Sequence, residues 1–365
     1  MNFFEFPGIK VSALAAAVPD CCQKNMDLAD MFPKDELKRF CDSTGIWERY
    51  ISTGQTASDL CVVAANEIFN KLDVDRDTID GIIFLSQTPD YSTPPTACLI
   101  QHRLGLDNCG LAFDSNIGCT GFPYGIQMAC ANLMAGCQRV LLLVGDADPV
   151  RGWNGDISKD SMLFGDCGVA AVLEKAEEGP PIRCAIHTIG KGYKAIMTPY
   201  GGARHSIADL YRERGEEGIK ACTIHGGVLE GPDVFSFSII DAPKTAKKYF
   251  QHFDCSVNDY DLISIHQANK MIVDNVAKRI KAPAEKVAIS LDRYGNTRGG
   301  STAINILDYA QREQGNSGTM RIFNLAFGIG LNVAIADFQI DAGRTLPIIK
   351  TQEGFDDGIT NYTYF

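Results

Sequence analysis

The chain has 365 residues, of which 45% are hydrophobic and 22% are charged, and its formal net charge is −11. These values are typical of a soluble globular protein, and the negative charge argues against general nucleic-acid binding, which needs a positive surface. No apolar run approaches the roughly 18 residues that span a bilayer, and the first ten residues do not resemble a secretion signal. We therefore expect a cytoplasmic protein with no nucleic-acid or membrane partner.

Thirteen cysteines are spread along the chain without a Cys-x-x-Cys pair. An odd number of cysteines in a large chain without an export signal is typical of reduced thiols. The spacing lacks the ligand pattern of a zinc site, and there is no Walker A segment, no GxGxxG fingerprint and no HExxH. We expect no metal and no tightly bound cofactor.

Three apolar runs in the first part of the chain have the continuous hydrophobicity of strands that are buried on both faces. They cover residues 79–86, 110–115 and 139–146. Helical patterns over 94–104 and 121–135 lie between them. Strands that alternate with helices predict an α/β architecture.

The second part of the chain repeats this order. Strands are expected at 260–267, 286–292 and 320–330, with a Gly-rich bend and a helix at 301–312 between the last two. Two similar halves predict a duplicated fold with a pseudo-twofold axis, although short strands also resemble one another by chance.

Three polar side chains follow strands of the two predicted halves. Cys119 comes after the second strand of the first half, Asn296 after the corresponding strand of the second half, and His266 ends that half's first strand. Ligands collect beyond the carboxyl ends of strands in open α/β sheets, so we expect these three residues to converge.

The segment DSNIGCTGFPYG (114–125) places Cys119 among small residues, where a predicted strand gives way to a helix. A helix N-terminus favours the thiolate, which is the nucleophilic form of cysteine. We therefore expect Cys119 to be ionised and to attack a carbonyl carbon. The alternative interpretation is a small buried apolar residue, which we retain for the other twelve cysteines.

Histidine can move a proton or donate to a developing oxyanion, and asparagine can donate a hydrogen bond without changing its charge. Taken singly, His266 and Asn296 could equally be structural residues, but with Cys119 they suit acyl transfer through a thioester. The spacing also permits a papain-like protease. The absence of the CGxCW-type sequence of that family counts against it.

Ordered motifs along residues 8–340 carry a resemblance to a known family. They are STGIWERYIS (43–52), FDSNIGCTGF (113–122), SMLFGDCGVAAVL (161–173), HQAN (266–269), GNT (295–297) and FGIGL (327–331). In these motifs the chain resembles the β-ketoacyl-acyl-carrier-protein synthase III branch of the thiolase-fold condensing enzymes.

The resemblance implies a thiolase-like duplicated five-layer α-β-α-β-α fold. We expect a first half at 1–178 that carries the nucleophile, a second half at 179–340 that carries His and Asn, and an extension of unknown role at 341–365. A homodimer formed through the first half is also a family trait.

The resemblance further implies a decarboxylative Claisen condensation. Cys119 would take an acyl group from acyl-coenzyme A or acyl-carrier protein, and His266 and Asn296 would stabilise the enolate formed from a malonyl thioester on acyl-carrier protein. The backbone N–H groups of Cys119 and Ile329 would form the oxyanion hole. The activity would belong to fatty-acid or related secondary-metabolite synthesis.

Several positions differ from the family pattern. Arg39 and Ser43 occupy positions where Trp and Arg commonly hold the adenine of coenzyme A, and Met271 replaces an Arg after the histidine motif. Three neighbouring cations are candidates for docking acyl-carrier protein in its place, and the alternative interpretation is a solvated helix face. The three cations are Lys270, Lys278 and Arg279.

Two other functions remain open from the sequence. One is acyl transfer from Cys119 to a hydroxyl or amine acceptor without decarboxylation, which the Gly-rich segment PYGGARHS (199–206) and the altered motifs allow. The other is a non-enzymatic role as the inactive partner of a heterodimer.

Overall fold

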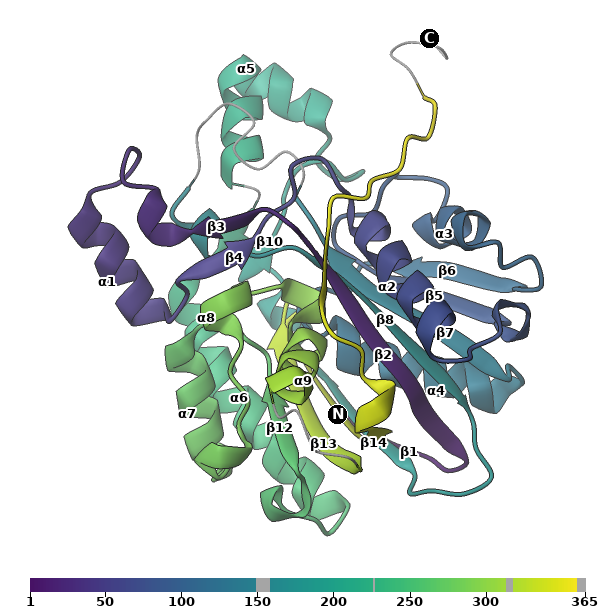
Figure 1. The fold of residues 1–365 in the computed structure, drawn as a ribbon. Helices are drawn as coiled ribbons and strands as arrows, with labels where there is room; N and C mark the ends of the chain where they lie inside the picture. Colours follow the sequence, from purple (N-terminus) through teal and green to yellow (C-terminus); the bar gives the residue numbers. More distant parts are fainter. Residues whose placement is uncertain (149–157, 226, 313–317, 360–365) are drawn as a thin grey trace.

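The computed structural model describes residues 1–148, 158–225, 227–312 and 318–359, which form two mixed β-sheets between layers of helices (Figure 1). The strands of the first sheet are β2 (Ile9–Pro19), β5 (Gly81–Leu85), β6 (Leu111–Ser115), β7 (Arg139–Asp146), β8 (Cys167–Lys175) and β15 (Ile349–Thr351). Their order across the sheet is β15-β2-β8-β7-β5-β6.

The second sheet has five strands, in the order β1-β9-β14-β13-β12. These are β1 (Asn2–Phe6), β9 (Ile182–Thr188), β12 (Leu262–Ile265), β13 (Thr319–Gly328) and β14 (Asn332–Asp341). The first strand of the chain thus pairs with β9 in the second sheet, while the late strand β15 pairs with β2 in the first. The division at residue 178 into two halves stays a prediction, and these two strands cross it.

Helices cover both sheets and fill the space between them. The outer face of the first sheet carries α2 (Ala57–Lys71) and α3 (Thr96–Leu104), and the outer face of the second carries α6 (Gly231–His252) and α7 (Lys270–Ile280). Between the sheets lie α4 (Gly121–Ala135) and α9 (Ser301–Arg312). The predicted five-layer α-β-α-β-α fold is confirmed.

The strand β7 explains why buried strands here have no polar alternation. Leu141 and Leu143 pack with α2 and α3, whereas Val140, Leu142 and Val144 pack with the central helices. Successive side chains point to opposite faces of a sheet, so a strand with helices on both faces must be apolar at every position.

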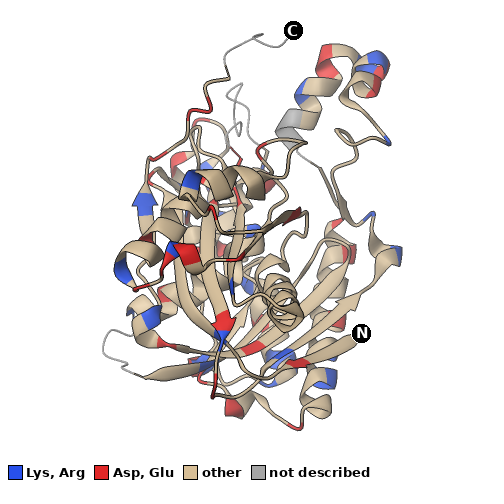
Figure 2. Cartoon of the chain, turned by 90° about the vertical axis from the view of Figure 1, so that its right-hand side faces the viewer, with Lys and Arg blue, Asp and Glu red and all other residues tan. Residues whose placement is uncertain are grey.

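Smaller elements stand at one end of these layers. They are α1 (Lys34–Thr44), α5 (Ile207–His225), α8 (Leu291–Tyr294) and the two-stranded pairs β3 (Cys22–Lys24) with β4 (Glu48–Tyr50) and β10 (Ile196–Met197) with β11 (Val228–Leu229). The Gly-rich segment 199–206 leads into α5, which stands away from the two sheets (Figures 1 and 2).

One predicted strand is wrong. Residues 286–292 form no strand, and only an isolated bridge joins Val287 to Ile263 of β12. Side chains satisfy the backbone groups that a ladder would have used: Asn305 Nδ2 donates to the carbonyl of Ala288, at 3.1 Å. Buried backbone groups need a partner, but that partner need not be another strand.

The C-terminal extension runs along the first half of the molecule. At the end of β15 and just beyond it, Gln55 Nε2 donates to the carbonyls of Thr351 and Glu353, at 3.2 and 2.8 Å. The ring of Phe355 then lies 4.5 Å from the guanidinium carbon of Arg103. The described part of the extension is therefore anchored to Gln55, just before α2, and to α3, and it does not enter either sheet beyond β15.

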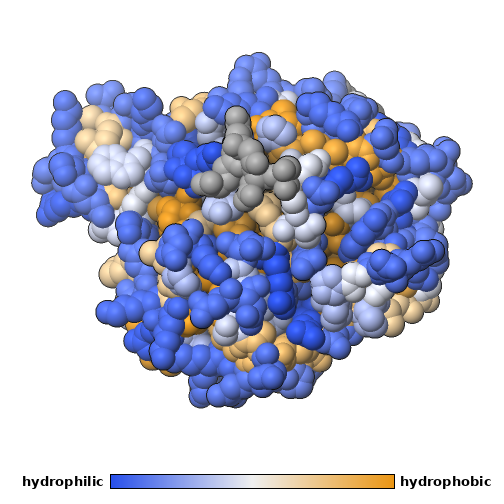
Figure 3. Space-filling model, turned by 60° about the horizontal axis from the view of Figure 1, so that its bottom comes forward, coloured by the Kyte–Doolittle hydropathy of each residue, from blue (hydrophilic) through white to orange (hydrophobic). Residues whose placement is uncertain are grey.

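The surface of the described residues is polar and mixed in charge. Figure 2 shows basic and acidic residues interspersed along the outer helices and loops, and Figure 3 shows a face that is mostly hydrophilic with small hydrophobic patches. No helix among the described residues combines the length and the apolar character needed to cross a membrane.

Candidate functional site

Cys119 lies between the end of β6, in the first sheet, and the start of α4, and it lies against Gly328 of the second sheet. A Cβ atom on Gly328, the last residue of β13, would lie 2.5 Å from Cys119 Cβ and 3.0 Å from its Sγ. Thr120 Oγ1 also donates to Asn332 Oδ1 across this boundary, at 2.6 Å. Glycine at position 328 therefore lets the second sheet approach the sulfur.

Burial raises the pKa of the Cys119 thiol to about 12, and the nearby Asp146 carboxylate acts in the same direction. The Arg298 guanidinium and the backbone N–H groups of Ile329 and Cys119 oppose this increase in pKa. Desolvation of the thiol therefore opposes the ionisation that we expected from the helix N-terminus. The sulfur must lose its proton as it reacts.

The two N–H groups predicted for an oxyanion hole face this sulfur. Those of Cys119 and Ile329 both donate hydrogen bonds that lower the pKa of the thiol. Developing negative charge beside Sγ would therefore meet two fixed donors. Their role in catalysis remains a proposal.

His266 follows β12 and is held from both its backbone and its ring. Its N–H donates to the carbonyl of Leu325, at 2.9 Å, and its Nδ1 lies 2.6 Å from Ser301 Oγ at the start of α9. The ring meets that of Phe327 edge to face, with centroids 5.5 Å apart. Burial lowers the pKa of His266 to about 3, so the imidazole is neutral at physiological pH.

Asn296 is fixed on a segment of the first half. Its N–H donates to the carbonyl of Leu163, at 2.8 Å, and its carbonyl accepts from the N–H of Gly165, at 3.1 Å. Its side-chain Oδ1 accepts from the N–H of Arg298, at 3.0 Å. The amide oxygen is thus occupied, and the Nδ2 group remains to donate to a ligand.

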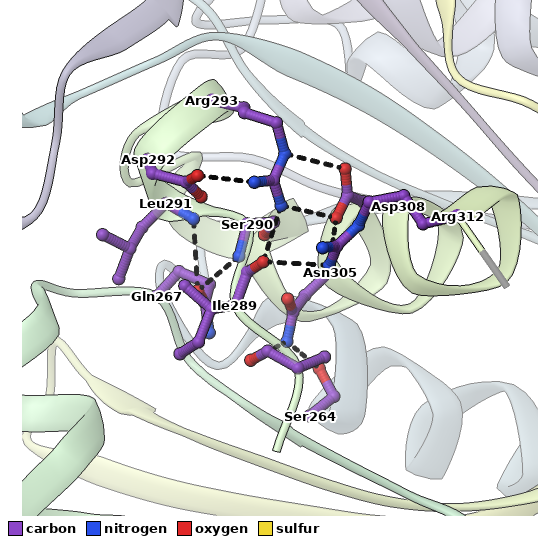
Figure 4. Close-up of polar contacts among 11 residues, drawn as sticks. Ser264, Gln267, Ile289, Ser290, Leu291, Asp292, Arg293, Asn305, Asp308 and Arg312 are labelled. Atoms are coloured by element: carbon purple, nitrogen blue, oxygen red, sulfur yellow. Dashed lines mark hydrogen bonds and ion pairs between the residues drawn. The ribbon is translucent and has the colours of Figure 1, made fainter. Parts of the chain in front are cut away.

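Gln267 connects the histidine segment to the asparagine segment (Figure 4). Its Nε2 donates to the carbonyl of Ile265, at 2.7 Å, and its Oε1 accepts from the N–H groups of Ser290 and Leu291, at 3.1 and 3.3 Å. These two N–H groups stand at the start of α8, which leads directly to Asn296. One side chain therefore sets the distance between the end of β12 and the turn.

Ion pairs between α8 and α9 also hold α8 in place (Figure 4). Arg293 pairs with Asp308 of α9 at 2.8 Å and donates to the carbonyl of Ile289 at 2.6 Å. Arg312 reaches the same carboxylate of Asp308 at 3.0 Å. Because α9 also supplies Ser301, the helix that orients His266 is the helix that anchors α8.

Intermediate residues link the segments that carry Cys119, His266 and Asn296, and the convergence of the three side chains in one pocket stays a prediction. Gly328 lies against Cys119, and the ring of its neighbour Phe327 contacts the His266 ring edge to face. A Cβ on Gly299 would lie 3.0 Å from the carbonyl oxygen of Gly118, so the asparagine turn packs on the nucleophile loop. The sequence analysis assigned no role to Gln267 or Ser301, although Gln267 lies within the HQAN motif and Ser301 begins the helix predicted at 301–312.

The predicted docking residues lie on α7 and are exposed. Lys270 pairs with Asp274 at 2.5 Å, and Lys278 and Arg279 stand in the last turn of the helix. Lys270 also packs near Gly45 at the end of α1. This is the arrangement of a solvated helix face, and docking of acyl-carrier protein there remains a proposal.

A cavity opens beside α1, near the two positions that differ from the adenine-binding pattern. Its lining residues are Phe32, Glu36, Leu37, Arg39, Phe40, Ser43, Lys159 and Met162. Arg39 pairs with Asp35 at 3.0 Å, and Lys159 pairs with Glu36 at 2.5 Å. The cations of this cavity are therefore already engaged by carboxylates of α1.

Comparison with known proteins agrees with the motifs. Residues 113–190 match the family described as 3-oxoacyl-[acyl-carrier-protein (ACP)] synthase III, and residues 250–340 match its C-terminal region. A β-ketoacyl-[acyl-carrier-protein] synthase III of Symbiobacterium thermophilum is 32% identical over 326 residues, which are 88% of this chain and 95% of the relative. The enzyme of that name from Clostridium novyi is 30% identical over 88% of this chain and 96% of the relative.

Solved structures give the same result for the fold. The crystal structure of 3-oxoacyl-(acyl-carrier protein) synthase from Burkholderia xenovorans has a TM-score of 0.84 and 27% identity, and the match covers 96% of this chain and 99% of that one. The crystal structure of a priming β-ketosynthase from the R1128 polyketide pathway, at 24% identity, has a TM-score of 0.77 over 93% of this chain and 98% of that one.

Proposed function

Because this chain belongs to the 3-oxoacyl-[acyl-carrier-protein] synthase III family, we propose that it condenses an acyl thioester with a malonyl thioester on acyl-carrier protein. The single observation that carries the proposal is the placement of Cys119 against the second sheet, with the backbone N–H groups of Cys119 and Ile329 facing its sulfur. Thiol, oxyanion donors and a neutral imidazole are the groups that the reaction needs.

In the first step, Cys119 Sγ attacks the carbonyl carbon of the acyl donor. The bond from that carbon to the donor sulfur breaks, and the donor thiol leaves with the proton that Cys119 gives up. Negative charge on the carbonyl oxygen of the tetrahedral intermediate is stabilised by the two backbone N–H groups, and the loss of one such donor typically costs about 2.7–4 kcal/mol of barrier.

In the second step, the bond between the malonyl carboxylate carbon and the α-carbon breaks. Carbon dioxide leaves, and the electron pair of that bond forms an enolate whose negative charge lies on the thioester oxygen. Asn296 Nδ2 and His266 Nε2 donate hydrogen bonds to this oxygen. Donation from the Ser301 hydroxyl to His266 Nδ1 would fix the tautomer that carries its proton on Nε2.

In the third step, the α-carbon of the enolate attacks the carbonyl carbon of acyl-Cys119. The carbon–sulfur bond to Cys119 then breaks, the β-ketoacyl product remains on acyl-carrier protein, and the sulfur regains a proton from water. No step needs a tightly bound cofactor, since the two thioesters and the named protein groups account for every bond. We expect the enzyme to act as a cytoplasmic homodimer.

The test is incubation with an acyl-coenzyme A or acyl-carrier-protein donor and malonyl-acyl-carrier protein. Release of one carbon dioxide for each β-ketoacyl product supports condensation. Acyl transfer to a hydroxyl or amine without carbon dioxide would replace the proposal with simple acyl transfer, and the absence of any adduct on Cys119 with either donor would favour an inactive partner role.

A further inference from the structure

We propose that Arg298 is a positioning residue for the decarboxylation step, which it serves by orienting the carboxamide of Asn296. This inference rests on the proposed function and deepens it. Arg298 does not contact the thioester itself in this proposal. Arg298 acts through Asn296. Its backbone N–H holds the Asn296 amide oxygen, and its guanidinium holds the turn against Asp166.

The backbone of Arg298 sets the direction of the Asn296 amide. The N–H of Arg298 donates to Asn296 Oδ1, two residues earlier, at 3.0 Å, which is the hydrogen bond of an Asx turn. With Oδ1 engaged, Nδ2 is directed away from the turn. If this hydrogen bond were lost, the amide could rotate and present its oxygen to the enolate, which would repel the developing negative charge.

The turn that makes this hydrogen bond is strained at Arg298. Its φ is +49°, in the left-handed region that side-chain-bearing residues rarely adopt. Such a conformation persists only where surrounding contacts hold it. The next residue supplies one such contact, because the N–H of Gly299 donates to the buried carboxylate of Asp146 at 3.2 Å.

The side chain of Arg298 supplies further contacts, all on the first half of the molecule. Its Nη1 lies 3.5 Å from Oδ1 of Asp166, and its guanidinium carbon lies 5.2 Å from the ring centre of Phe164. The Arg298 side chain is 14% exposed and that of Asp166 is fully buried. Asp166 is itself fixed, because its Oδ2 accepts from the N–H of Ser52 at 2.8 Å.

These contacts tie the asparagine turn to the segment that also holds the Asn296 backbone. Phe164 lies between Leu163 and Gly165, whose carbonyl and N–H pair with Asn296. One short stretch of the first half therefore positions both the main chain and the side chain of Asn296. A shift of about 1 Å in a reacting group can cost as much as a hundredfold in rate, so this anchoring bears on catalysis.

The experiment measures carbon dioxide release from malonyl-acyl-carrier protein in the absence of an acyl donor. It compares Arg298→Ala, Arg298→Gly, Asn296→Ala and the double variant Arg298→Ala/Asn296→Ala, each in the native chain and with Cys119→Ala. The Cys119→Ala background is needed because the Arg298 charge also lowers the pKa of the Cys119 thiol. In a chain without that thiol, a change in its pKa cannot alter the release of carbon dioxide.

We expect Arg298→Ala to lower carbon dioxide release about tenfold or more. Arg298→Gly should lower carbon dioxide release less than Arg298→Ala does, because glycine accepts the positive φ without strain. In the Asn296→Ala background, Arg298→Ala should add no more than about a twofold loss, since the group that it positions is already gone. As a matched control, Arg321→Gln removes a partly buried arginine that pairs with Asp337 at 2.9 Å, and should leave the release unchanged.

Unchanged release in Arg298→Ala would overturn the positioning role, and so would a full tenfold loss on top of Asn296→Ala. Thermal unfolding of each variant identifies a loss that comes from misfolding, and Arg298→Gly, which keeps the backbone relaxed, then decides the case. No carbon dioxide from the native chain, even when an acyl donor is supplied with malonyl-acyl-carrier protein, would overturn the proposed function and this inference with it, whereas normal release in the native chain and in Arg298→Ala overturns this inference alone.

Discussion

The Nδ1 atom of His266 lies 2.6 Å from the hydroxyl oxygen of Ser301, at the first residue of α9. His266 is 2% exposed and Ser301 is 1% exposed, so neither atom can exchange this partner for water. If the hydroxyl donates to Nδ1, as the proposed mechanism requires, the imidazole carries its proton on Nε2.

Ser301→Ala should lower carbon dioxide release from malonyl-acyl-carrier protein about tenfold, because the imidazole loses the hydrogen bond that fixes its tautomer. Acylation of Cys119 should change much less. Ser264→Ala is the matched control: Ser264 is also buried and donates to the carbonyl of Thr302 at 2.9 Å, without touching His266. Equal losses in both variants would count against the orienting role of Ser301.

Cys119→Ala should abolish the acyl adduct seen by intact-mass spectrometry after treatment with an acyl thioester. Cys130→Ala should keep the adduct, because Cys130 is fully buried in α4 and burial raises the pKa of its thiol well above the usual value. An adduct that survives Cys119→Ala would assign the nucleophile to another of the thirteen cysteines.

The rate of Cys119 acylation should rise with pH across the range from 6 to 9, by up to about tenfold per unit. With a pKa of about 12 the thiol is protonated throughout this range, and each added pH unit multiplies the thiolate fraction by about ten. The neutral His266 imposes no acid limb above pH 5, because burial lowers its pKa to about 3. Single-turnover acylation followed by mass spectrometry measures the profile, and a plateau near pH 7 would contradict it.

The free energy of unfolding should fall with acid in a way that depends on His266. The folded state keeps the imidazole neutral down to a pKa of about 3, whereas the unfolded chain takes up a proton near 6.5. The contribution of His266 to the free energy of unfolding is therefore fully present above pH 6.5 and is lost as pH falls toward 3. Over that range the free energy of unfolding falls by up to about 1.4 kcal/mol per pH unit.

His266→Gln should remove that slope. Urea unfolding of the native chain and of the variant at pH 7, 6, 5 and 4 gives the comparison. The difference between the two slopes is the measured quantity, because the substitution also changes stability at every pH. Parallel curves would show that His266 does not titrate as its burial requires.

Gln267→Leu should lower the free energy of unfolding by about 2–4 kcal/mol, because the N–H groups of Ser290 and Leu291 would lose their acceptor inside the protein. It should also slow carbon dioxide release, since α8 leads to Asn296. Gln101→Leu provides the control: Gln101 donates to the carbonyls of Leu106 and Cys109, both at 3.2 Å, in the first half. That variant should lose stability and keep its rate of carbon dioxide release.

Much of the fold could be predicted from local patterns. The strand at 139–146 and the helices at 121–135 and 301–312 have the predicted bounds. In the two helices the apolar residues recur with the helical period, and the strand is recognised by its continuous apolar run. The failure at 286–292 has the opposite cause, because the side chains of Gln267 and Asn305 take up backbone groups there, and these contacts join residues far apart in the chain.

The sequence by itself determined the α/β order, the candidate nucleophile and the two candidate hydrogen-bond donors, because residue type and spacing along one element carry that information. Only the tertiary structure decided the burial that shifts the pKa values of Cys119 and His266, since desolvation depends on everything packed around a group and not on its neighbours in the chain. Tertiary structure also decided which atoms orient the donors, because the decisive contacts join residues far apart in the chain: Ser301 with His266, Gln267 with Ser290, and the Arg298 guanidinium with Asp166.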